Sequence, residues 1–107
     1  MPDLFGQTFF MTQPNTYLPI VKSLFLQNGD PARAEGQMRY MRNQFGYYGL
    51  KAPETAALTR QLWAEHGLPD GEPLKTLARL CFEDEYREVQ YFALFTVEKT
   101  LKKQSAD

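Results

Sequence analysis

Apolar residues recur along most of the chain at the three- and four-residue spacing of amphipathic helices. The first stripe consists of Tyr17, Leu18, Ile20, Val21, Leu24 and Phe25. Asn15 or Thr16 is expected to cap this helix at its start, and Asn28-Gly29 is expected to end it. Pro19 is tolerable here because it falls in the predicted first turn.

Two further helices follow at short intervals. Asp30-Pro31 predicts the start of a second helix, because an N-cap residue precedes proline at the first helical position. Its apolar face consists of Ala34, Met38, Met41 and Phe45. Residues 46–52 are predicted to form a loop. A third helix is expected to open at Pro53 and to end before Gly67, since glycine is typical just past a last turn.

The last part of the chain predicts two more helices. The fourth begins at Pro73 and has an apolar stripe of Leu74, Leu77, Ala78 and Cys81. Residues 83–85 form a corner, and the fifth helix follows with Val89, Phe92, Ala93, Val97, Thr100 and Leu101. Tyr86, Tyr91, Leu94 and Phe95 extend its apolar face almost all round, which predicts packing on two sides.

No segment alternates with period two, so the pattern predicts an all-α fold without strands. Five helices joined by short loops favour antiparallel helix pairs stacked as a HEAT-like α-solenoid, a class whose repeat is about 40 residues long. We expect a leader of uncertain order at residues 1–14, a helical-repeat domain at 15–104 and a polar tail at 105–107.

Composition narrows the function classes. The chain has 107 residues and a net charge of −1, with Cys81 as its single cysteine. A disulfide framework or cysteine zinc site within the chain is therefore excluded, and a reducing, cytoplasmic location is expected. No apolar run approaches the ~20 residues of a membrane span. His66 is the single histidine and the acids are scattered, so we predict no metal site.

Positive charge is concentrated in the second and third predicted helices. Residues 33–60 hold five cations and two acids, whereas residues 61–90 hold three cations and seven acids. Arg39 and Arg42 are expected to share a helix face, with Tyr40 between them and Lys51 in the following loop. This pattern suits phosphate contacts and base stacking. A solvated helix face whose cations pair with the acidic segment remains the alternative.

Two tyrosines, Tyr47 and Tyr48, lie between Gly46 and Gly49. We expect one ring to fill the gap between helices and the other to face a ligand. The acids of residues 83–88 are best explained by solvation or helix capping. The spacing therefore predicts no catalytic residue.

Two motifs resemble a known family. Arg39-Tyr40-Met41-Arg42-Asn43-Gln44-Phe45, followed by Gly49-Leu50 and Pro53, resembles the RYMKNxFxFxGIxxPxR signature of the DNA alkylation repair enzymes, the AlkD-type alkylpurine DNA glycosylases. Residues 87–94, REVQYFAL, resemble the RExQxxAL helix of the same family. The resemblance runs from about residue 17 to residue 103, over what is the N-terminal part of the family domain.

The resemblance implies a HEAT-like superhelix with a positively charged, concave face for double-stranded DNA. It also implies hydrolysis of the N-glycosidic bond of N3- or N7-alkylated purines without metal or cofactor. In the family, the catalytic aspartate and tryptophans lie on helices C-terminal to the part that this sequence resembles. We therefore expect the 107-residue chain alone to bind DNA weakly and to release no base. Tyr40 matches a family residue that borders the lesion.

A second interpretation remains open. The chain also fits a helical-repeat protein-interaction module without catalytic function. In that case the apolar side of the fifth helix is expected to mediate self-association or partner binding, since an uncapped helical stack leaves apolar surface exposed. Membrane binding is not expected.

Overall fold

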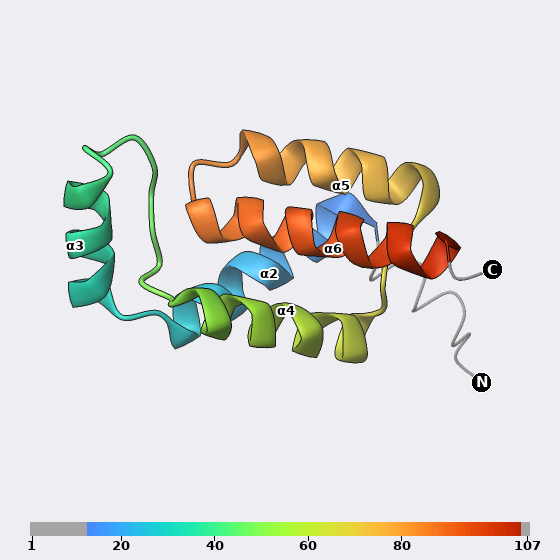
Figure 1. The fold of residues 1–107 in the computed structure, drawn as a ribbon, viewed down its shortest axis with the longest axis horizontal. Helices are drawn as coiled ribbons and strands as arrows, with labels where there is room; N and C mark the ends of the chain where they lie inside the picture. The colour runs from blue at the N-terminus through green and yellow to red at the C-terminus, as the bar shows by residue number, and fades with distance from the viewer. Residues whose placement is uncertain (1–12, 106–107) are drawn as a thin grey trace.

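The computed structural model describes residues 13–105. These residues form five helices and no strand (Figure 1). The predicted all-α fold is therefore confirmed, and the arrangement is compatible with a solenoid-like stack. The helices are α2 (Pro14–Asn28), α3 (Pro31–Tyr40), α4 (Ala52–His66), α5 (Gly71–Glu83) and α6 (Arg87–Ser105). Residues 1–12, most of the predicted leader, and residues 106–107 of the predicted tail lie outside the described range.

Four of the five helices pack together, and α6 is at their centre. It lies between α5 and α4, and α2 covers these helices from behind (Figure 1). By contrast, α3 stands at one end of the molecule, apart from the other helices. Packing on several sides explains why the apolar face of α6 is so wide in the sequence.

The core lies where α2, α4, α5 and α6 meet. The Tyr17 ring of α2 lies against Phe92 of α6, with 5.6 Å between ring centroids, and both side chains are fully buried. The Tyr17 hydroxyl donates to the Gly67 carbonyl at 2.8 Å and so joins α2 to the end of α4. Cys81 belongs to the same core, and burial raises the pKa of its thiol to about 12.

Several helix boundaries differ from the predictions. The first helix begins at Pro14, and neither Asn15 nor Thr16 caps it, because proline already fits the first turn. Pro19 consequently lies inside α2. Similarly, α5 begins at Gly71, two residues before Pro73.

Three predicted boundaries are confirmed. The first helix, α2, ends at Asn28, directly before Gly29. Asp30 caps α3, and its carboxylate accepts from the backbone N–H groups of Ala32 and Arg33. Gly67 follows α4 with φ of 100°. Among the described residues, no helix is both long enough and apolar enough to cross a membrane.

Candidate nucleic-acid interface

The helix with the basic and aromatic motif, α3, is held in place by side chains that reach the following loop. Arg33 donates to the Gly49 carbonyl at 3.0 Å and to the Glu54 carboxylate of α4 at 3.3 Å. Gln37 donates to the Leu50 carbonyl at 3.2 Å. These bonds fix a helix that has little hydrophobic packing of its own, so the loop at residues 46–51 determines where α3 lies.

The predicted DNA-contacting side chains at this end of the molecule are accessible. Tyr40 is 87% exposed at the end of α3, and Arg39 forms only a solvent-exposed ion pair with Glu35, at 3.7 Å. An exposed pair of this kind contributes little to stability. Arg42 and Lys51 are exposed as well. All four predicted residues could therefore contact a polyanion without first breaking a buried interaction.

The expectation that Arg39 and Arg42 share a helix face is wrong, because α3 ends at Tyr40. The N–H of Asn43 donates to the Met38 carbonyl at 2.7 Å, and the N–H of Arg42 donates to the Arg39 carbonyl at 3.1 Å. This pair of bonds is a Schellman motif, which usually places glycine where Arg42 stands. Arg42 and Asn43 have φ of 55° and 60°.

Replacing Arg42 with glycine should therefore stabilise the fold. The left-handed conformation costs a non-glycine residue about 1–2 kcal/mol, while glycine adopts it freely. Since glycine also gains more entropy on unfolding, we expect a net increase of up to about 1 kcal/mol in the free energy of unfolding. Urea denaturation of Arg42→Gly measures this change in the free energy of unfolding. Arg39→Gly is the control: because Arg39 lies within α3, this variant should be less stable than the wild type.

The two tyrosines of the loop have different environments. Tyr48 is 8% exposed and stacks on Tyr86 with ring centroids 4.1 Å apart. Burial raises the pKa of its hydroxyl. Tyr47 is half-buried and, with Tyr40, lines a pocket of about 520 Å³ beside α3. Of the two, only Tyr47 is placed to contact a ligand.

Glu88 of α6 holds the loop from inside the protein. Its side chain is 2% exposed, and its carboxylate accepts from the backbone N–H groups of Tyr48, Gly49 and Leu50 at 3.1–3.2 Å. The acid that the sequence assigns to solvation or capping is therefore a buried acceptor for three loop amides. Both family-like motifs meet at this point.

Arg87 and Tyr91, from the same 87–94 motif as Glu88, link the start of α6 to the aromatic ring of Phe45. The Arg87 guanidinium lies 4.5 Å from the Phe45 ring centroid and 5.1 Å from that of Tyr91. It also donates to Gln90 at 2.7 Å. Tyr91 stacks in turn on Phe95, one helical turn further along, with ring centroids 6.4 Å apart. A row of aromatic faces thus leads from the loop along α6.

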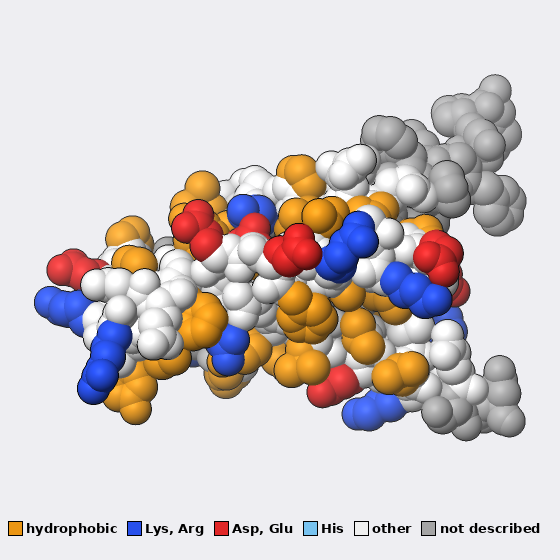
Figure 2. Space-filling model, turned by 90° about the horizontal axis from the view of Figure 1, so that it is seen from above, with side chains coloured by type: hydrophobic (Ala, Val, Ile, Leu, Met, Phe, Trp, Pro, Cys, Tyr) orange, Lys and Arg blue, Asp and Glu red, His pale blue; other side chains and the backbone are white. Residues whose placement is uncertain are grey.

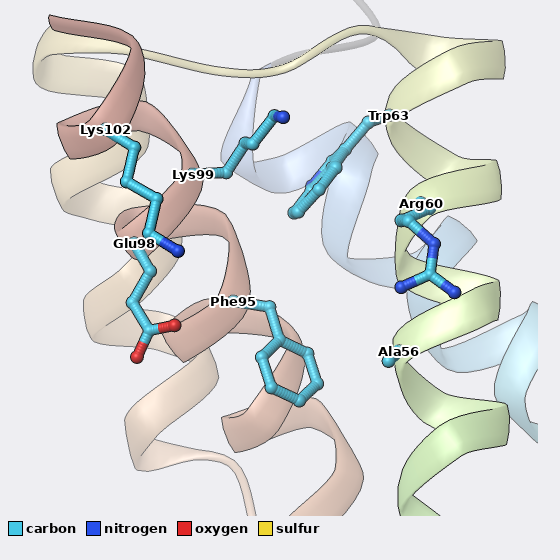
Figure 3. Close-up of a pocket in the computed structure, with 7 residues that line it drawn as sticks. All are labelled: Ala56, Arg60, Trp63, Phe95, Glu98, Lys99 and Lys102. Carbon is cyan, nitrogen blue, oxygen red and sulfur yellow. The ribbon is translucent and has the colours of Figure 1, made fainter. Parts of the chain in front are cut away.

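This row ends in a pocket of about 360 Å³ between α4 and α6 (Figure 3). Trp63 reaches into it from α4, opposite Phe95 of α6, and Arg60 lies along the α4 side of the pocket. The remaining lining residues are Ala56, Glu98, Lys99 and Lys102. Trp63 is fixed by a hydrogen bond from its indole Nε1 to Thr96 Oγ1 at 3.0 Å.

The cations of this pocket are available for a ligand. Arg60, Lys99 and Lys102 are exposed, and none of them forms an ion pair with another described residue. Sequence reasoning missed Lys99 and Lys102 because they belong to a segment far from Arg60 along the chain. The sequence did contain a signal for this surface: Phe95, Lys99 and Lys102 are spaced four and three residues apart, which places them on one side of α6.

No group of three or more His, Cys, Asp or Glu side chains suited to a metal ion occurs in the described part of the chain. What the side chains do provide is a protruding helix with exposed cations and a groove with aromatic faces and unpaired cations. Such a combination suits a phosphate backbone with exposed bases.

The structure defines an all-α protein with a basic, aromatic-lined groove. A family model described as "DNA alkylation repair enzyme" matches residues 21–107. The chain therefore belongs to the DNA alkylation repair enzyme family, as the two sequence motifs predict. No curated protein matches the sequence.

Proposed function

We propose that this chain is the DNA-binding, N-terminal part of a DNA alkylation repair glycosylase that acts on N3- and N7-alkylated purines. Family membership supports a role in DNA repair. The observation that carries the DNA-binding proposal is the groove between α4 and α6, which Arg60, Lys99 and Lys102 line together with Trp63 and Phe95. Arg39, Tyr40, Arg42 and Lys51 extend the same proposed contact surface onto α3 and its loop.

The proposed reaction suits an enzyme without metal or cofactor. Alkylation at N3 or N7 gives the purine a positive charge, so the base is already a good leaving group. The protein then needs mainly to bind the duplex and to stabilise positive charge that develops on the sugar. The side chains of this chain serve the first task in the proposal, and none of them is assigned a catalytic role.

Salt-dependent binding of a short labelled duplex tests the proposal. We expect binding that weakens steeply with salt, because each phosphate contact adds about −0.9 to the slope of log K against log salt. Lys99→Glu with Lys102→Glu should reduce the magnitude of this slope by about two. Fluorescence anisotropy at several salt concentrations measures both quantities.

Arg79→Glu is the matched control for each single substitution, Lys99→Glu or Lys102→Glu, since Arg79 is an exposed arginine on α5 outside the pocket. Its slope should stay closer to that of the wild type. Arg39→Glu with Arg42→Glu separately tests the contribution of α3. Equal losses in all variants would indicate a general charge effect and contradict a localised site.

A protein-interaction module is the second candidate function. The observation that favours it is the exposure of large apolar side chains on α6, where Leu94 is 43% exposed and Leu101 57% exposed. Self-association through α6 is therefore also proposed. Absence of duplex binding at low salt, together with self-association, would favour this candidate.

In either case we place the protein in the cytoplasm, where its single free cysteine suits reducing conditions.

A further inference from the structure

An apolar surface extends over the outer sides of α5 and α6. Leu94 and Leu101 form its ridge on α6, and Phe82, 50% exposed, lies on α5. Between the helices is a groove of about 300 Å³ whose lining includes Leu74, Ala78 and Val97. Figure 2, in which the α5 side faces the viewer, shows hydrophobic side chains gathered in the middle of the molecule between charged ones. Exposed apolar patches of this kind commonly mark interaction sites.

The charges at the two ends of this surface have opposite signs. At the corner between α5 and α6, Glu83 and Glu85 are exposed and form no ion pair with a described residue. At the opposite end, Lys102 and Lys103 are exposed in the last turn of α6. The nearby Lys75 is balanced by Glu72 at 3.0 Å.

We propose that a second copy of this chain docks on the α5–α6 surface, with the two α6 helices antiparallel across a two-fold axis near Leu94. This inference specifies the self-association proposed above and rests on it. A two-fold interface is self-complementary, so Leu94 of each copy packs against Leu94 of the other. The antiparallel orientation brings the basic end of each α6 towards the acidic corner of the other copy, whereas a parallel orientation would place like charges together.

The proposed interface leaves the candidate DNA groove accessible. Glu98, Lys99 and Lys102 line the pocket on the α4 side of α6, while Val97 and Leu101 line the groove on the α5 side. Lys102, near the end of α6, is the one residue that both surfaces share in the proposal. Substitutions at positions other than Lys102 therefore test association and duplex binding separately.

Sedimentation velocity over a range of concentrations and salt tests association first. One chain has a mass of 12.4 kDa, and we expect a dimer whose population falls with added salt. Leu94→Glu should raise the dimer dissociation constant at least about tenfold, because it places a charge in the apolar contact. Leu26→Glu is the control, since Leu26 is an exposed leucine on α2, 69% exposed, and it should leave the constant unchanged.

Charge reversal tests the orientation. Glu83→Lys with Glu85→Lys, and separately Lys102→Glu with Lys103→Glu, should each weaken self-association. A mixture of the two variants should form a heterodimer more tightly than either forms a homodimer. A monomer at all concentrations would overturn self-association itself. A dimer that persists in Leu94→Glu would overturn this surface alone, and a mixture without heterodimers would overturn the antiparallel arrangement.

Discussion

Replacing Glu88 with alanine should lower the free energy of unfolding by about 3–5 kcal/mol. The carboxylate is buried and accepts from the N–H groups of Tyr48, Gly49 and Leu50. Alanine leaves all three donors without an acceptor and opens a void beside them. Each unsatisfied buried donor costs about 1–3 kcal/mol, partly relieved if water enters.

The neutral isostere separates the effect of charge from that of shape. In Glu88→Gln the amide oxygen still accepts, but its NH₂ group faces backbone donors, so we expect a loss of about 2 kcal/mol. Glu98→Gln, at an exposed glutamate of the same helix, should change stability by no more than about 0.5 kcal/mol. Urea unfolding at neutral pH, followed by circular dichroism, compares the three variants with the wild type.

A functional consequence accompanies the loss of stability. The loop that Glu88 holds also carries the Gly49 and Leu50 carbonyls, which accept from Arg33 and Gln37 of α3. Glu88→Gln should therefore loosen α3 and weaken duplex binding, even at temperatures where the protein remains folded. Wild-type stability in Glu88→Ala would show that the loop amides find other acceptors.

The roles of the two motifs illustrate what sequence reasoning can and cannot establish. Helical periodicity predicted the number of helices, and residue chemistry predicted the Asp30 cap and the Gly67 end, because these signals are local. The partner of Glu88 could not be predicted, since an acid near a helix start usually faces water or the helix dipole. Its buried position follows from the loop at residues 46–51, which passes the start of α6 and is hydrogen-bonded there to Glu85 and Arg87.

The early end of α3 and the groove between α4 and α6 were missed for related reasons. A Schellman motif is normally recognised in a sequence by a glycine at its left-handed position, and here Arg42 occupies that position. The groove joins Arg60 to Lys99 across two helices, and only their packing brings these residues together. Sequence thus predicted the exposed motif residues of the candidate site but not the cations of its pocket.

Gly49→Ala should destabilise the protein by about 3 kcal/mol or more. Gly49 has φ of 90°, and a Cβ atom on it would lie 2.0 Å from the Asp30 carbonyl oxygen. No flexible side chain can yield there, because the contact is with backbone. Any shift also disturbs the Gly49 carbonyl, which accepts from the N–H of Asp30 at 3.2 Å and from Arg33. Thermal and urea unfolding measure the loss.

Gly36→Ala provides a control with the opposite sign. Gly36 lies in the middle of α3, and nothing lies within 4 Å of a Cβ atom built on it. Alanine should therefore stabilise the helix by about 0.5–1 kcal/mol. The same substitution would thus act in opposite directions at two glycines of one helix–loop unit, because one is needed for a close backbone contact and the other is not. A similar loss in both variants would mean that the Asp30–Gly49 contact is not what makes Gly49 necessary.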